Sequence, residues 1–140
     1  MQPSLTVTHS SGFYADVWGS NIAESGGAEY EADLSVGWSG DLGKGTAVDV
    51  YAMYYACPQA SGLNYAEVGV SLSQAVGEGS IAAELSYAPA QEGTNKLDWM
   101  VGAEYDLGKG FAAGINYVDS YRSQLREGRA GVIANLRFEF

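Results

Sequence analysis

The chain has 140 residues, including 19 Gly and 10 Tyr but only 3 Pro, and its formal net charge is -10. This length fits a single domain, and the acidic balance argues against nucleic acid as a partner and against adhesion to an anionic membrane surface. A single cysteine, Cys57, excludes a disulfide within the chain. No apolar run approaches the roughly 18 residues of a membrane helix, and no signal peptide is visible at the N-terminus.

Nine runs of alternating apolar and polar residues follow one another along the chain. A period of two puts successive side chains on opposite faces, so each run predicts a β-strand. In the clearest run, 29–39, Tyr30 and Leu34 share one face while Glu31 and Asp33 share the other. Several runs reach the length of about 9 to 11 residues that a tilted strand needs to cross a bilayer. The runs are 4–9, 13–20, 29–39, 46–56, 65–74, 80–87, 97–107, 111–118 and 130–140.

The connections between these runs alternate in length. Short turns on one side and longer loops on the other are typical of outer-membrane barrels, with the turns in the periplasm and the loops outside the cell. The short connections are 10–12, 40–45, 75–79 and 108–110, and the longer ones are 21–28, 57–64, 88–96 and 119–129.

The sequence Asp-Leu-Gly-Lys-Gly occurs at 41–45 and again at 106–110, each time between two alternating runs. Its spacing is not that of a phosphate-binding P-loop, and no helix is predicted after it. Glycine supplies the positive φ that a tight hairpin turn needs. We therefore expect two hairpin turns here, and the repeat indicates duplication of a hairpin.

The apolar face sorts its residues by size when the C-terminus is placed at the periplasmic end. Aliphatic residues such as Leu34, Val50, Val70, Ile115 and Leu136 fall between aromatic residues at both strand ends. Two aromatic girdles around an aliphatic band are expected at two lipid–water interfaces. The predicted lipid-interface residues are Tyr30, Trp38, Tyr54, Tyr87, Trp99, Tyr105, Phe111, Tyr117, Phe138 and Phe140.

The opposite face collects acids, and Arg137 is the only base predicted on it. The other bases are expected in turns or loops, Lys44, Lys96 and Lys109 among them. In a barrel this face is the lumen, whereas in a soluble sandwich it would be the solvated surface. The predicted lumen-lining residues are Asp16, Glu31, Asp33, Asp49, Tyr51, Glu67, Glu84, Asp98, Glu104, Asp106, Arg137 and Glu139.

These patterns predict an all-β fold: a single antiparallel transmembrane β-barrel of about eight to ten strands over residues 1–140, in the bacterial outer membrane. The last run alternates up to Phe140, and this ending resembles the signal read by the bacterial barrel-assembly machinery. Nine runs are an odd number, whereas single-chain bacterial barrels have an even one. We expect a missing partner strand, from this sequence or another chain, rather than eight strands closing with 4–9 outside the ring.

The segment 11–21, Ser-Gly-Phe-Tyr-Ala-Asp-Val-Trp-Gly-Ser-Asn, resembles the characteristic segment of the TorF-like family of porin-like proteins of Proteobacteria. Gly37-Trp38-Ser39-Gly40, 51–58 and 64–68 extend the likeness, which covers about residues 3–107 and the last strand. The resemblance implies the outer membrane and a barrel fold. Members of that family also carry an N-terminal signal and at least one strand before the segment that matches 2–9, so the resemblance implies a strand missing from the expected barrel.

No catalytic residue and no cofactor are predicted, and the chain is not expected to be an enzyme. His9 is the only histidine, so a Ser-His-Asp site would have to include it. Acids at period two, such as Glu29, Glu31 and Asp33, leave binding of a divalent ion open, but no metal-binding signature accompanies them. Outer-membrane lipid and lipopolysaccharide are expected partners, the latter through the loop bases Arg122, Arg126 and Arg129.

We expect passive passage of small solutes, with a preference for cations. A non-conducting structural or adhesion-type barrel, plugged by ion pairs and tyrosines, is the alternative, because about eight strands leave room only for side chains. A soluble lipocalin-like barrel with the aliphatic face inside is a third class. So many acids cannot all be ionised in a narrow lumen, so mobile cations, protonation or a bound divalent ion must relieve the repulsion.

Overall fold

The computed structural model describes residues 2–22, 27–91, 94–121 and 130–139. Within them the protein is all-β, with nine strands and one short 3-10 helix, η1 (Ser61–Leu63). The strands confirm the nine predicted runs, and several extend further than expected. They are β1 (Ser4–Thr8), β2 (Phe13–Asn21), β3 (Tyr30–Gly43), β4 (Thr46–Ala56), β5 (Tyr65–Val76), β6 (Gly79–Gln91), β7 (Thr94–Gly108), β8 (Phe111–Tyr121) and β9 (Gly131–Phe138).

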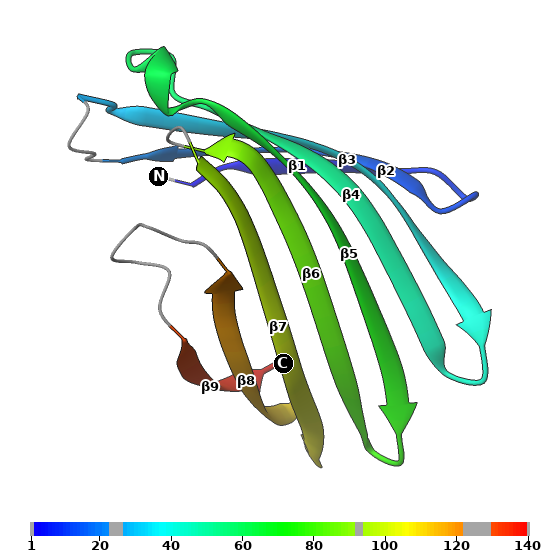
Figure 1. Cartoon of the computed structure of the whole chain (residues 1–140). Helices are drawn as coiled ribbons and strands as arrows, with labels where there is room; N and C mark the ends of the chain where they lie inside the picture. The colour runs from blue at the N-terminus through cyan, green and yellow to red at the C-terminus, as the bar shows by residue number, and fades with distance from the viewer. Residues whose placement is uncertain (1, 23–26, 92–93, 122–129, 140) are drawn as a thin grey trace.

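Each strand pairs antiparallel with the next one along the chain, so the nine strands form one sheet in sequence order. The sheet is strongly curved, and β1 and β9 are its two edges (Figure 1). Within the described residues these two edges do not pair with each other. β1 pairs with β2 and belongs to the sheet, so the structure differs from a closed ring of eight strands with residues 4–9 outside it.

The two faces of the sheet differ in exposure. Side chains on the inside of a curved sheet converge and shield one another, whereas those on the outside diverge. On β3, Ser35 is 8% exposed, whereas its neighbours Leu34 and Val36 are 49% and 60% exposed. The same contrast separates Ser86 from Leu85 on β6. We therefore call the concave side that carries Ser35 and Ser86 the inner face, and the side that carries Leu34 and Leu85 the outer face.

Both copies of the five-residue repeat, 41–45 and 106–110, form the same hairpin turn. In each copy the lysine and the following glycine make a two-residue loop, and φ is 56° at both Lys44 and Lys109. Positive φ at both loop positions is the requirement of a type I′ turn. The aspartate of each copy accepts a hydrogen bond from the backbone N–H two residues later, at 2.5 Å and 2.7 Å. The predicted turns are confirmed.

At the opposite end, the predicted loop 88–96 is wrong, and the predicted loop 119–129 begins later than expected. β6 and β7 continue to pair as far as Gln91 and Thr94, so most of 88–96 is strand. The register shifts after Ala88, where Pro89 cannot donate to the ladder, and such irregular positions tolerate proline within a strand. β8 likewise continues to Tyr121, which takes the start of 119–129 into the sheet.

The described residues contain little enclosed core. The buried apolar residues among them are Ala28, Cys57, Ala88 and Ala112. Large aliphatic side chains are instead exposed on the outer face, which is the reverse of a soluble barrel with its aliphatic residues inside. No helix in this part of the chain is long and apolar enough to span a membrane.

Candidate functional site

The inner face carries the residues that the sequence assigned to a lumen. Strand pairing puts them on one side of the sheet, as where Asp16 pairs with Ser35 and Glu104 with Gly114. Most are half-buried because neighbouring side chains cover them, and those at the turn end of β7 and β9 are exposed. The half-buried set is Asp16, Glu31, Asp33, Asp49, Tyr51, Glu67, Glu84, Asp98 and Glu104, and the exposed set is Asp106, Arg137 and Glu139.

Tyr14 on β2 leans over a glycine to reach an acid two strands away. Its cross-strand partner on β3 is Gly37, and a Cβ atom at that position would overlap the tyrosine ring. The Tyr14 hydroxyl donates a hydrogen bond to Asp49 Oδ1 on β4 at 3.0 Å. Position 37 therefore requires glycine, because the Tyr14 ring occupies the space that any larger side chain would need. The ring covers the glycine backbone.

Tyr51 repeats this arrangement two strands further along. Its partner on β5 is Gly69, where a Cβ atom would again overlap the tyrosine ring. The Tyr51 hydroxyl lies 3.0 Å from Glu67 Oε1 on β5 and 3.1 Å from Glu84 Oε1 on β6. A phenol has one hydrogen, so it cannot donate fully to two carboxylates at once. One hydroxyl thus links two acids across neighbouring strands.

Asparagines take the place of tyrosines on the last three strands. Asn116 on β8 lies over Gly102 on β7, and Asn135 on β9 lies over Gly114 on β8. These side chains are smaller than tyrosine, so they leave more open space above the sheet. A hollow of about 220 Å³ is lined here by the same residues together with Ser80, Ala82, Ala103 and Glu104.

Arg137 lies on β9 beside two acids. Its Nη2 is 2.8 Å from Glu104 Oε1 on β7, and its Nη1 forms an ion pair with Glu139. These groups line a polar hollow of about 260 Å³ together with Asp106 and the turn residue Lys109. The three partners are at least one-third exposed, so water screens the pairs and each contributes little to folding.

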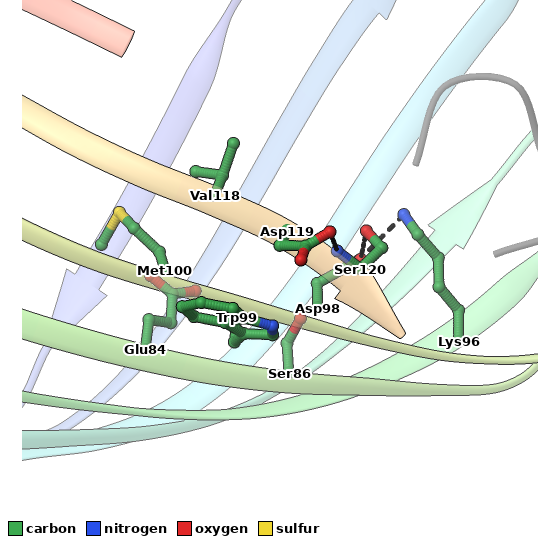
Figure 2. A pocket seen from close by; sticks show the side chains of 9 residues that line it. All are labelled: Glu84, Ser86, Lys96, Asp98, Trp99, Met100, Val118, Asp119 and Ser120. Atoms are coloured by element: carbon green, nitrogen blue, oxygen red, sulfur yellow. Dashed lines mark hydrogen bonds and ion pairs between the residues drawn. The ribbon is translucent and has the colours of Figure 1, made fainter. Parts of the chain in front are cut away.

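A second base lies on the inner face, contrary to expectation. Lys96 was predicted in a loop, but β7 already begins at Thr94, so Lys96 is a strand residue on the same side as Asp98. Its Nζ is 2.8 Å from Asp98 Oδ2, and the hydroxyl of Ser120 donates to the other oxygen (Figure 2). A hollow of about 340 Å³ surrounds this group, with Glu84, Ser86 and Met100 also in its wall (Figure 2).

A row of aromatic and acidic residues crosses the inner face near the ends of β3 and β4. Trp18 pairs with Asp33, Asp33 with Tyr55 and Tyr55 with Tyr65, on four consecutive strands. The rings of Tyr55 and Tyr65 stack, with centroids 4.2 Å apart and planes 15° apart. Asp33 Oδ1 is shielded from solvent and receives no hydrogen bond from the described residues. We call these four residues the aromatic–acidic row.

The described aromatic residues assigned to the lipid interface lie on the outer face. Tyr30, Tyr54, Phe111 and Phe138 lie within two residues of a strand end, whereas Trp38 and Trp99 lie five residues inside β3 and β7. Some have polar contacts: Tyr105 donates to Glu78 Oε2 at 3.0 Å, and Trp38 Nε1 donates to the backbone oxygen of Ser11 at 2.9 Å. Two pairs contact across strands, namely Trp99 with Tyr117 at 5.2 Å and Phe111 with Phe138 at 4.4 Å between centroids. Tyr30, Tyr54 and Tyr87 are exposed on the same face, and Phe140 lies outside the described residues.

Other residues singled out in the sequence form no reactive centre. His9 lies in the β1–β2 turn, where its Nδ1 is 2.7 Å from the Ser11 hydroxyl. No group of His, Cys, Asp and Glu side chains suited to a metal ion occurs among the described residues. The loop bases Arg122, Arg126 and Arg129 lie outside those residues.

Sequence comparison matches residues 1–96, more than half of the chain, to a family described as bacterial protein of unknown function (Gcw_chp). The chain belongs to the Gcw_chp family. No curated protein matches this Gcw_chp member significantly. Solved structures with a similar fold include two porins. One is a porin refined at 1.8 Å resolution, with 14% identity and a TM-score of 0.61, where 99% of this chain covers 50% of that chain.

The other is the NanC porin in a rhombohedral crystal form, with 10% identity and a TM-score of 0.66. There 96% of the Gcw_chp chain covers 70% of the porin chain. At such low identity the similarity concerns the fold, which is that of a porin-like β-barrel wall. The Gcw_chp chain spans half the length of the first of these porins.

Proposed function

We propose that the protein forms the wall of a porin-like β-barrel in the outer membrane. This barrel lets small solutes pass without energy input and prefers cations. The observation that carries the proposal is the two-sided sheet. Its convex outer face exposes aliphatic side chains, while its concave inner face holds acids and their hydrogen-bonding partners. On this proposal the protein acts as a channel and catalyses no reaction.

The outer face supports the membrane location. Exposed aliphatic residues such as Leu34, Val50, Val70, Leu85 and Val101 lie on the five consecutive strands β3 to β7, on one face. Soluble monomers rarely expose a contiguous apolar patch of more than a few hundred Å². In an outer-membrane barrel, alternate residues of each strand contact the lipid hydrocarbon, so an exposed aliphatic face is expected there. Aromatic residues at strand ends, such as Tyr30 and Phe111, fit the two lipid–water interfaces.

The inner face supports passage of cations. Acids line it from β2 to β7, and the described bases on it, Lys96 and Arg137, are each paired with acids. Rings of acidic side chains favour cations over anions in a pore. Most of these carboxylates keep partial contact with solvent, which favours a water-filled path with mobile cations.

We further propose that the ring is completed by additional strand structure, in this protein or a partner chain. The unpaired edges β1 and β9 support this, because an open edge in hydrocarbon leaves backbone groups unsatisfied at several kcal/mol each. The alternating β9 also supports handling by the barrel-assembly machinery. Lipopolysaccharide is the proposed outer contact, and the segment at 11–21 supports kinship with the TorF-like porins.

A non-conducting structural or adhesion-type barrel is the second candidate. The hydrogen bonds from Tyr14 and Tyr51 to inner-face acids favour it, since they hold rings flat over the sheet and satisfy carboxylates without mobile ions. In that case some carboxyl groups carry protons and the interior does not conduct.

Planar bilayers under a salt gradient test the proposal. We expect a reversal potential of cationic sign, which the double variant Asp33→Asn with Glu104→Gln reduces. Asp33→Glu with Glu104→Asp is the matched control, because it changes the same two positions and keeps both negative charges. Anion preference, or selectivity that the double variant does not change, would contradict the inner face as the path. Absence of conductance would favour the structural barrel.

A further inference from the structure

We propose that the aromatic–acidic row is a recognition site for organic cations, in particular ammonium groups that carry methyl or other apolar substituents. The inference rests on the proposed pore, since it assigns a class of solute to one position on its wall. It concerns Trp18, Asp33, Tyr55 and Tyr65, which lie on β2, β3, β4 and β5 in one line across the inner face.

The register puts a carboxylate between aromatic rings. Asp33 is directly opposite Trp18 on one side and Tyr55 on the other. Directly paired residues of antiparallel strands have Cβ atoms about 4.5 to 5.5 Å apart. Asp33 therefore has an aromatic side chain as its direct cross-strand neighbour on each side, and a cation–π interaction is effective within about 6 Å of a ring centroid. Tyr65 stacks behind Tyr55 and fixes the orientation of its ring.

The protein itself leaves this carboxylate undersatisfied. Asp33 Oδ1 is shielded from solvent and accepts no hydrogen bond from the described residues. By contrast, Asp49 accepts a bond from Tyr14, and Asp98 is paired with Lys96. Asp33 as a whole is only half-buried, so a cation on the inner face can still approach the carboxylate, and the partly dehydrated surroundings strengthen the attraction between them.

Neighbouring acids strengthen the field at the row. Glu31 lies two residues before Asp33 on β3 and points to the same face, and Glu67 lies two residues after Tyr65 on β5. The row also lies next to the end of the sheet where the connections 22–29 and 57–64 join the strands. A solute that enters from that end meets this site first.

Aromatic rings distinguish an organic cation from a hydrated metal ion. A methylated ammonium is weakly hydrated and presents apolar CH groups to a ring face, whereas small metal ions prefer several oxygen ligands. Asp33 stands between two aromatic residues, and no group of acids suited to a metal ion occurs among the described residues. The chemistry of the row therefore fits a substituted ammonium such as choline.

Binding of choline to the full chain in detergent micelles, measured by titration calorimetry, tests the inference. The matched ligand is 3,3-dimethyl-1-butanol, in which carbon replaces the charged nitrogen. We expect choline to bind at least tenfold more tightly than this neutral isostere. Equal affinity for the two would overturn the inference without any variant being made.

Variants then locate the site. Asp33→Asn and Tyr55→Leu should each weaken choline binding about tenfold, while Tyr55→Phe, which keeps the ring, should stay within about twofold. Asp49→Asn removes an acid of the same face outside the row and should have little effect. Equal loss in Asp49→Asn and Asp33→Asn would overturn the inference, because it would indicate general attraction to acids.

This binding experiment needs no conductance. If the chain binds choline at the row but does not conduct, the recognition site is supported and the proposed pore is contradicted. If the chain conducts cations but binds choline and its isostere equally, the pore is supported and the recognition site is contradicted.

Discussion

The ring of Tyr51 on β4 lies over Gly69 on β5, and the two residues are direct cross-strand partners. The ring takes the space of the absent side chain, and its hydroxyl reaches Glu67 and Glu84. Tyr14 and Gly37 show the same relationship on β2 and β3. The inner face is thus held together by side chains that reach across strands, while the outer face has none of these acids to satisfy.

Gly69→Ala should destabilise the fold. The added Cβ overlaps the Tyr51 ring and displaces it from its two acids, and overpacking of this kind costs about 1–3 kcal/mol. The measurement is the free energy of unfolding by urea from lipid vesicles. Gly62→Ala is the matched control, since a Cβ there meets open space. Equal stability of the two variants would show that the Tyr51 ring moves without cost.

Val70→Arg on the outer face should impair insertion and folding in vesicles. A charge at mid-membrane on the lipid side of a barrel costs about 2–4 kcal/mol. The adjacent Ser71→Arg is the control, because Ser71 faces inward and pairs with Asp49 and Glu84. Folded fraction, followed by heat-modifiable mobility on gels, distinguishes them. If both variants fold equally well, lipid does not contact the outer face.

Lys44→Asn should stabilise the β3–β4 hairpin, whereas Lys44→Val should destabilise it. The residue has a φ of 56°, a region that asparagine tolerates and that costs most other residues about 1–2 kcal/mol. Lys109 has the same φ in the second copy of the turn, so its substitutions should give the same order. Unfolding free energies of the four variants provide the check, and an opposite order at either site would contradict the shared geometry.

Arg137→Gln should increase cation preference in a conducting barrel. Its loss leaves Glu104 and Glu139 without their shared positive partner, so the inner face becomes more acidic. Arg137→Lys keeps the charge and serves as the control. The reversal potential under a salt gradient is the readout. A shift toward anions in the glutamine variant would mean that Arg137 does not face the conducting path.

Several features of the protein follow from the sequence alone. Strand positions and faces were predictable because alternation is a local property with a period of two, which needs no knowledge of the partner strand. The duplicated turn at 41–45 and 106–110 was predictable for the same reason, since glycine and the short spacing determine its φ angles. Residues such as Leu34 and Asp33 therefore separated onto opposite faces before any pairing was known.

Only the tertiary structure decided which residues meet across strands. The sequence placed Tyr51, Asp49 and Glu67 on one face. The packing of tyrosine rings over Gly37 and Gly69 depends on the register between strands, which no single strand contains. Lys96 was misplaced because pairing with β6 extends β7 beyond the residues whose alternation is clear. The position of Asp33 between Trp18 and Tyr55 likewise follows from two registers together, because side chains on separate strands become neighbours only when the sheet forms.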